Sequence, residues 1–225
     1  MPKSTREPSN TMAVPENPKI YHITHVDNLP SIMQTGHLSS DAKVIANATP
    51  HTTIGMSEIK QRRLNRIGVT CHPGTMVGEY VPFYFCPRSI MLYMMYKGNH
   101  PDITYKGGQG PIVHLQADLR AVVAWADADE KKWAFSDRNA GAFYTNFYND
   151  FRMLDKVNWD AVVSHDFSLS TILEKKQAEF LLYDSFPWHL VEHIGVHNAG
   201  IETQVRQALN GAARPTIRVE PTWYY

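Results

Sequence analysis

The chain has 225 residues, of which 43% are hydrophobic and 20% charged, enough for one domain or two small ones with a sizeable core. Its 22 basic and 22 acidic side chains balance, which excludes a protein that coats nucleic acid by net charge alone. Residues 1–106 nevertheless carry a net +4 and residues 107–225 a net −4. Two cysteines exclude a disulfide framework, and no apolar run reaches the roughly 18 residues of a membrane span. We therefore expect a soluble, cytoplasmic protein with a local basic face.

The first 18 residues differ in composition from the rest. They hold four of the 14 prolines among Ser, Thr, Asn and Glu, and they lack the apolar segment of a secretory signal. We expect residues 1–18 to be a mobile leader and residues 19–225 to form a single domain.

The first predicted element is a short strand over residues 19–24. Asp27 is placed to cap a helix over residues 28–35, which Gly36 ends. Residues 39–56 are rich in Ser, Thr, Ala and Asn without a clear period, which predicts a long irregular loop of the kind that carries function. A helix is then predicted over residues 57–66, with four positive charges within seven residues.

Further along, short strands alternate with short helices. Strands are predicted at residues 80–85, 112–115, 179–183, 194–196 and 216–219. Pro87 is placed to open a helix that runs to residue 96 and stops at Gly98, and further helical turns are expected at residues 170–178, 189–193 and 202–210. Residues 128–170 are acidic, aromatic and weakly periodic. The absence of regular βαβ units predicts an α+β fold.

Common catalytic motifs are missing from the sequence. There is no P-loop and no G-x-S-x-G, and the run Gly107-Gly108-Gln109-Gly110-Pro111 precedes a strand instead of opening a helix, unlike a dinucleotide fingerprint. His189 and His193 have helical metal-ligand spacing but no third ligand, so we expect no metal site.

Three separated features remain. They are His22 on the first strand, the aromatic strand at residues 80–85 that leads to Ser89 and Tyr93, and Glu179 at the head of an apolar strand. Each one alone is typical of ordinary structure: a hydrogen-bonded core histidine, an aromatic core strand and a solvated carboxylate. Their order along one chain forms a pattern.

This pattern resembles the His-Tyr-Glu ADP-ribosyltransferases, and most closely the DarT family of DNA ADP-ribosyltransferase toxins. The similar strings are YHITHVDNLP at residues 21–30, YVPFYFCPRS at 80–89, MLY at 91–93, GGQGPIVHL at 107–115 and KQAEF at 176–180. The resemblance implies an ADP-ribosyltransferase-like α+β fold with split β-sheets. It also implies an enzyme that breaks the nicotinamide glycosidic bond of NAD and passes ADP-ribose to an acceptor.

The resemblance assigns Glu179 to the catalytic centre, where a buried carboxylate would stabilise the positive charge that develops on the ribose. A neutral His22 could donate to a hydroxyl without repelling that charge. Tyr93 would stack near the nicotinamide ring, with Ser89 close to its carboxamide. The residues expected to bind NAD are His22, Ile23, Thr24, Ser31, Leu38, Tyr84, Ser89 and Tyr93.

Single-stranded DNA is the expected acceptor, because a duplex hides its base edges whereas a single strand can turn a base out. In this family, an arginine on the element before the Tyr-Phe strand is described as the proton acceptor. Arg63 is the first candidate for that arginine and Arg62 the second. Guanidinium is a poor base, so polarising a base carbonyl is the physically easier role. Residues 128–178 would select the acceptor, although their aromatic side chains fit a local core equally well. The residues expected to contact DNA are Arg62, Arg63, Arg66, Tyr144 and Tyr148.

Thymidine and guanosine are modified by different branches of the family, and the strings KQRR at residues 60–63 and GGQGP at 107–111 are more similar to the thymidine branch. Two other readings stay open: a protein- or RNA-directed ADP-ribosyltransferase, and a non-catalytic module that binds NAD or nucleic acid. An intact Glu179 counts against the second. The resemblance further implies a toxin–antitoxin pair with a DarG partner, whose macrodomain removes the modification.

Overall fold

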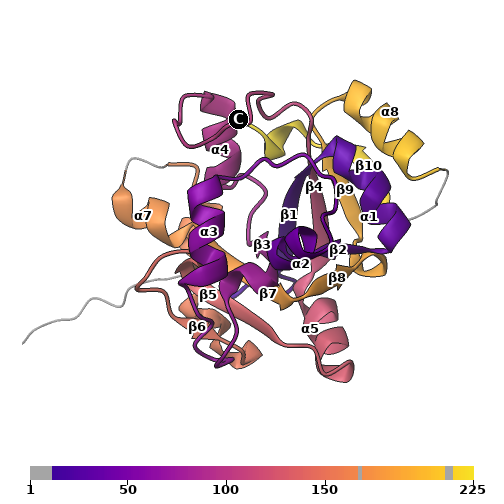
Figure 1. Cartoon of the computed structure of the whole chain (residues 1–225). Helices are drawn as coiled ribbons and strands as arrows, with labels where there is room; N and C mark the ends of the chain where they lie inside the picture. Colours follow the sequence, from indigo (N-terminus) through magenta and orange to yellow (C-terminus); the bar gives the residue numbers. More distant parts are fainter. Residues whose placement is uncertain (1–11, 167–168, 211–214) are drawn as a thin grey trace, which may run out of the picture.

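The computed structural model describes residues 12–166, 169–210 and 215–225. Within these ranges eight strands form one sheet in the order β10-β9-β4-β1-β3-β7-β5-β6, and β2 pairs with β8 apart from it (Figure 1). The strand bounds are β1 Lys19–His25, β2 His37–Ser39, β3 Tyr80–Tyr84, β4 Ile112–Asp118, β5 Trp133–Asn139, β6 Phe147–Tyr148, β7 Ala178–Tyr183, β8 Ser185–Pro187, β9 His193–Val196 and β10 Thr216–Val219. Their pairings are antiparallel apart from the parallel pair β9–β10. The α+β class is as predicted.

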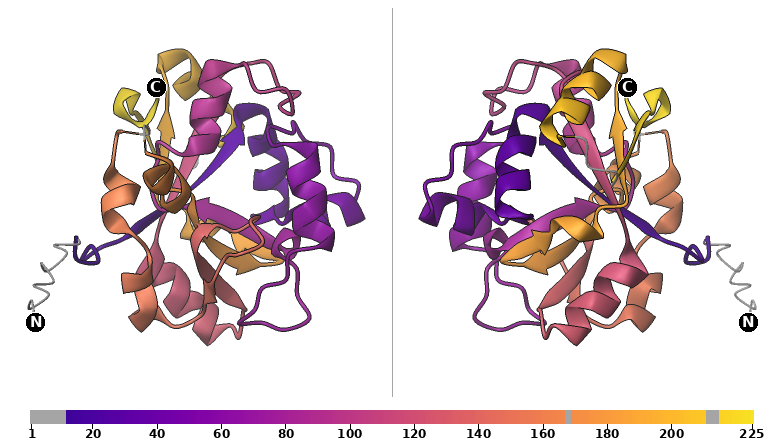
Figure 2. Two further views of the ribbon diagram at one scale, coloured as in Figure 1. Left: turned by 90° about the vertical axis from the view of Figure 1, so that its left-hand side faces the viewer. Right: turned by 90° about the vertical axis from the view of Figure 1, so that its right-hand side faces the viewer.

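The helices are short. They are α1 Leu29–Thr35, α2 Asp41–Ala46, α3 Ser57–Asn65, α4 Ile90–Lys97, α5 Leu119–Ala128, α6 Trp159–Val163, α7 Ser170–Lys175 and α8 Ala199–Ala208. Short 3₁₀ helices lie at Val26–Asn28, Val77–Glu79, Phe151–Lys156, Trp188–Leu190 and Pro221–Trp223. In Figure 1, α1, α2 and α3 lie in front of the sheet, and the left-hand view of Figure 2 shows them to one side of it.

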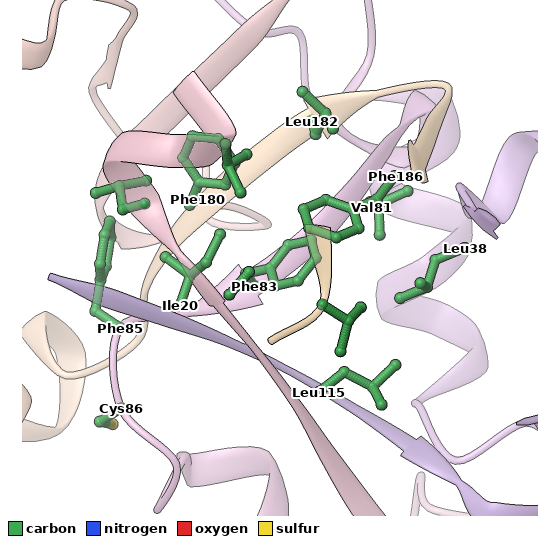
Figure 3. Packing of buried hydrophobic residues seen from close by; sticks show 14 of the residues in the cluster. Ile20, Leu38, Val81, Phe83, Phe85, Cys86, Leu115, Phe180, Leu182 and Phe186 are labelled. Carbon is green, nitrogen blue, oxygen red and sulfur yellow. The ribbon is translucent and has the colours of Figure 1, made fainter. Parts of the chain in front are cut away.

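Aromatic residues on the central strands fill the core. Phe83 on β3 is the register partner of Phe180 on β7, and its ring centroid lies 4.5 Å from that of Phe186 on β8. All three side chains are buried and lie together in Figure 3. Burying a phenylalanine side chain stabilises a fold by roughly 1.5–3 kcal/mol. This cluster therefore fixes β3 and β7, and the side chains on them, in place.

The large sheet is weakly joined at its centre. β1 pairs with β4 over seven residues and β3 with β7 over five, whereas the register between β1 and β3 in the described chain is the single pair Tyr21–Tyr84. Across the junction the Nδ1 of His22 lies 2.8 Å from the carbonyl oxygen of Pro82. The sheet thus divides into the halves β10-β9-β4-β1 and β3-β7-β5-β6, in agreement with the expected split sheet.

Two helices begin elsewhere than predicted. α1 starts at Leu29 after Asn28, while Asp27 lies in the preceding 3₁₀ turn, which the His25 side chain caps by accepting from the Asp27 amide at 3.2 Å. Pro87 does not open α4 either. Ser89 does so, because its hydroxyl accepts from the amide of Leu92 at 3.2 Å, as N-cap serines do.

The segment predicted to be irregular, residues 39–56, contains the end of β2 and all of α2. Ser40 caps α2 through a 3.2 Å bond from the Lys43 amide, and β2 is a strand because it pairs with β8, almost 150 residues further on. The sequence prediction was wrong here because that pairing is not visible locally. The prediction also left out α5, which Asp118 caps.

The part of the predicted leader within the described chain lies along the domain. Val14 packs against the core, the carbonyl of Glu16 accepts from the Arg120 side chain at 2.9 Å, and that of Pro18 accepts from the Leu119 amide at 3.0 Å. Residues 1–11 lie outside the described residues. The leader boundary at residue 18 stays a prediction.

Gly78, in the turn before β3, should be intolerant of a side chain. A Cβ there would lie 2.7 Å from the Leu64 side chain and 2.9 Å from its backbone, so α3 would have to move. Gly78→Ala is expected to lower the free energy of unfolding by about 1–3 kcal/mol in urea denaturation. Gly110→Ala is the matched control, since a Cβ there meets nothing within 4 Å. Equal stability of the two variants would contradict this packing.

Candidate active site

The junction of the two half-sheets brings three strands together. Tyr84 on β3 is the register partner of both Tyr21 on β1 and Glu179 on β7. Beside it lies a cavity of about 310 Å³, whose wall includes Pro82, Lys43 and Lys60. The wall also contains six of the eight residues predicted to bind NAD, namely His22, Ile23, Thr24, Ser31, Leu38 and Tyr84.

The other two predicted NAD residues do not line this cavity. Ser89 is fully buried as the N-cap of α4, and Tyr93 is half-buried with its ring edge-on to Tyr225 at a centroid distance of 5.0 Å. α4 reaches the cavity through Met91 instead. The structure therefore separates the polar residues of this helix from the six that it brings together.

Glu179 is held by a two-pronged ion pair. Its side chain is 3% exposed, and its Oε1 and Oε2 accept from Nη1 and Nη2 of Arg63 at 3.0 and 2.9 Å. The backbone amide of Ala140 donates to Oε1 as well, at 3.0 Å. Such bidentate, charge-assisted bonds fix direction as well as energy. The carboxylate is therefore locked in one orientation at the end of β7.

The neighbouring strand β5 and the residue that follows it fix Glu179 in this position. Its pairing with β7 is irregular between Phe135 and Asn139, a bulge that brings the amide of Ala140 to the carboxylate. The hydroxyl of Ser136 accepts from the Glu179 amide at 3.0 Å. The position of Glu179 thus depends on backbone irregularity in β5.

The charges of this group follow from its surroundings. Burial lowers the pKa of Arg63, but the Glu179 carboxylate outweighs this and the net pKa is raised. Burial, followed by the Glu179 charge, raises the pKa of Tyr84 far above its ordinary value. Arg63 is therefore a fixed cation and Tyr84 a protonated donor. A guanidinium held in this way stays charged and cannot serve as a base.

His22 is neutral in its resting state. Burial lowers its pKa from 6.5, and because the Pro82 carbonyl can only accept, the proton lies on Nδ1. A neutral ring protonated on Nδ1 presents Nε2 as an acceptor. The expectation that His22 donates to a hydroxyl is therefore reversed, and the ring would instead accept a hydrogen bond from one.

Adjacent arginines on α3 point in different directions, as residues about 100° apart on a helix do. Arg63 enters the junction, whereas the guanidinium carbon of Arg62 lies 5.8 Å from the ring centroid of Phe143. The Nε of Arg62 is buried without a hydrogen-bond partner among the described residues. Arg66, just after α3, is exposed. The structure thus separates Arg63, the first candidate from the sequence, from Arg62, the second.

The two predicted DNA-contacting tyrosines differ in setting. Tyr144 is 89% exposed beside Phe143, which is 65% exposed. Tyr148 is half-buried and stacks on Phe135 with centroids 5.3 Å apart. The loop after β5 therefore offers open aromatic faces at residues 143 and 144, while Tyr148 contributes to local packing.

Sequence reasoning missed the residues that support the carboxylate. The Ala140 amide binds the carboxylate directly, the Ser136 hydroxyl accepts from the backbone amide of Glu179, and Gln177 holds the bulge by accepting from the Asn139 side-chain amide at 2.9 Å. Gln177 lies in the turn just before β7, so no strand pattern marks it. The contribution of Ala140 is a backbone amide, and no residue type signals that. Among the described residues no three His, Cys, Asp or Glu side chains gather to hold a metal ion.

A histidine on β1 and a tyrosine on β3 that line one cavity, with a buried carboxylate on β7 paired in register with that tyrosine, form the arrangement of a His-Tyr-Glu ADP-ribosyltransferase. A family model described as ssDNA thymidine ADP-ribosyltransferase, DarT, matches residues 21–225. A DNA ADP-ribosyl transferase of Thermus sp. (strain 2.9) is 38% identical over 217 residues, which cover 94% of this chain and 98% of that protein.

Solved structures of the Thermus sp. 2.9 DarT share the fold. The complex with ADP-ribosylated ssDNA has a TM-score of 0.86 and 35% identity over 96% of this chain and 100% of that one. The complex with NAD+ has a TM-score of 0.81 and 34% identity over 95% and 100%. A fusion of a DNA ADP-ribosyl transferase with a DNA ADP-ribosyl glycohydrolase from Thermosipho africanus is 24% identical over 92% of this chain and 49% of that protein.

The chain belongs to the DarT family of ssDNA thymidine ADP-ribosyltransferases. It is thus a DNA ADP-ribosyltransferase enzyme with NAD as its substrate. This confirms the predicted fold, enzyme class and thymidine branch. The roles of individual residues rest on the geometry above.

NAD binding should weaken less than about twofold as pH falls from 8 to 6.5. Burial lowers the pKa of His22 below 6.5, so more than half of the rings stay neutral throughout that range, and protonation, which turns Nε2 into a donor, is half complete only below pH 6.5. Calorimetric titration of NAD in this range is expected to give an affinity that is constant within about twofold. The same titration of His22→Gln identifies any dependence due to other groups. A weakening centred on 6.5 in the wild type alone would contradict a neutral His22.

Proposed function

We propose that Glu179 is the catalytic carboxylate, that Arg63 is the residue acting on thymine, and that the junction cavity binds NAD. The observation that carries this proposal is the buried pair itself, in which the Glu179 carboxylate and the Arg63 guanidinium meet. Glu179 is the register partner of Tyr84, which lines the cavity. A buried ion pair next to a cavity is typical of catalytic sites.

The cavity suits a dinucleotide in chemistry and size. Its wall holds the ammonium groups of Lys43 and Lys60, each fixed by a carboxylate, at 2.6 Å from Asp184 and 2.7 Å from Asp41. Leu38 provides an apolar surface in the same wall. Cations fit the diphosphate of NAD, and ligand cavities usually measure about 300–1,000 Å³.

NAD supplies the ADP-ribose and the nicotinamide leaving group. The bonds that Glu179 already makes leave room for substrate: two N–H groups point at Oε1 and one at Oε2. A carboxylate offers about four lone-pair sites, so Oε2 can accept one more hydrogen bond from a ribose hydroxyl. Glu179 can therefore stabilise positive charge on the ribose while Arg63 stays in place.

Arg63 has capacity for the acceptor base in the same state. Glu179 uses two of the five N–H donors of its guanidinium. The remaining donors can bind a thymine carbonyl, which favours the deprotonated ring nitrogen and positions it for attack. Arg62 and Tyr144, on the adjoining surface, would contact the neighbouring nucleotides of a single strand. Arg66 would add a phosphate contact.

The Thermosipho relative, which joins a transferase to a glycohydrolase, supports a DarG-type antitoxin partner with a macrodomain for this chain. A DNA substrate supports action in the cytoplasm. No helix in the described ranges is both long and apolar enough to cross a membrane. We retain residues 19–225 as one ADP-ribosyltransferase domain behind a leader at 1–18.

A mass measurement on synthetic single-stranded oligonucleotides tests this proposal. With NAD, the wild type is expected to add one ADP-ribose to an oligonucleotide containing thymine, and Glu179→Gln none, because the amide keeps the shape of the side chain but not its charge. An oligonucleotide without thymine is the control. Modification of guanine alone, or full activity of Glu179→Gln, would refute the proposal.

A further inference from the structure

A ladder of aromatic and cationic side chains covers the outer side of α4. The guanidinium carbon of Arg88 lies 4.4 Å from the ring centroid of Tyr225, and Tyr225 stacks against Tyr96 with centroids 6.1 Å apart at 25°. The ammonium of Lys97 lies 5.5 and 5.8 Å from the ring centroids of Tyr93 and Tyr96. We call these five residues the α4 ladder.

The outer residues of the α4 ladder are not needed for the core. α4 packs inward through Ile90, Leu92 and Met95, whereas Tyr96 is 50% exposed and Lys97 is exposed. Half of the surface of Tyr96 is therefore available for contact with a ligand.

Tyr225, one ring of the α4 ladder, is held in place by Gln109 and by the backbone of Arg88. The Gln109 side chain brackets the backbone of Tyr225, accepting from its amide at 3.0 Å and donating to its carbonyl. The Tyr225 hydroxyl donates to the carbonyl of Arg88 at 2.9 Å. The GGQGP run therefore positions an aromatic ring, and a ligand that stacks here meets a surface already ordered.

The α4 ladder adjoins the active site on two sides. Met91, five residues or about 7.5 Å of helix rise before Tyr96, lines the NAD cavity. Arg88 donates to the ring of His165 at 3.0 Å, within the segment expected to select the acceptor. In Figure 1, α3, α4 and α7 all lie toward the left, the side that faces the viewer in the left-hand view of Figure 2, and the C-terminus lies beside α4.

We propose that the α4 ladder is a second DNA-binding surface, which stacks the bases and contacts the phosphates of single-stranded DNA flanking the modified thymidine. This inference rests on the proposed function. The two cations match a phosphate backbone, and stacking on tyrosine is indifferent to base identity. In a chain without net charge, such local contacts must supply the affinity for the strand.

The test compares Michaelis constants for a short thymine oligonucleotide and one extended on both sides. Tyr96→Ala is expected to raise KM for the long oligonucleotide at least about fivefold, as loss of one stacked base does. Its kcat, its KM for the short oligonucleotide and its release of nicotinamide from NAD should equal the wild type. Tyr96→Phe keeps the ring and should restore wild-type values.

Lys97→Ala should raise KM for the long strand and reduce its salt dependence, whereas Lys131→Ala, an exposed lysine just after α5, should not. Binding of the same strands without NAD, by fluorescence anisotropy, separates the two proposals, because it does not require catalysis. The inference is overturned if Tyr96→Ala binds the long strand like the wild type, or if it impairs short and long strands equally. A changed oligomeric state with unchanged DNA binding would overturn it too.

Discussion

The site depends on one ion pair buried where the two half-sheets meet. A carboxylate removed from water is tolerable only with a counter-charge and further hydrogen bonds, and Glu179 has Arg63 for the first and the Ala140 amide for the second. The pair also joins distant parts of the chain, since Arg63 comes from α3 and Glu179 from β7. The close approach of Gly78 to Leu64 keeps α3 near enough for this contact.

The weak junction between β1 and β3 helps to form the site. If β1 and β3 paired along their length, the carbonyl of Pro82 would bond a strand instead of the ring of His22. Because β1 and β3 barely pair at this junction, the Pro82 carbonyl is free to fix the tautomer of the His22 ring, and both residues line the cavity. On either side of the junction, the longer pairings of β3 with β7 and of β1 with β4 hold the two half-sheets together internally.

Sequence patterns predicted the parts of this structure that are local. The residue composition predicted strands β1, β3, β4 and β7. The order of His22, Tyr84 and Glu179 along the chain indicated the family. Contacts made by distant or backbone groups were not visible. The pairing of β2 with β8 and the bulge in β5 have no local signature, and the choice between Arg62 and Arg63 depends on about 100° of helix rotation. The role of Ser89 in NAD binding stays a prediction, and its N-cap role at α4 accounts for its burial without substrate.

In the proposed ion pair Glu179 serves NAD cleavage and Arg63 serves transfer to thymine, and measuring NAD cleavage with and without DNA distinguishes the two roles. Arg63→Lys keeps a counter-charge for Glu179 but loses the planar set of donors, so it should still release nicotinamide from NAD in the absence of DNA, with water as the acceptor. It should transfer ADP-ribose to thymine at least about 100-fold more slowly, as loss of one electrostatic donor does. Glu179→Gln should lose both reactions. Transfer to DNA at the wild-type rate by Arg63→Lys, or release of nicotinamide by Glu179→Gln, would overturn this division.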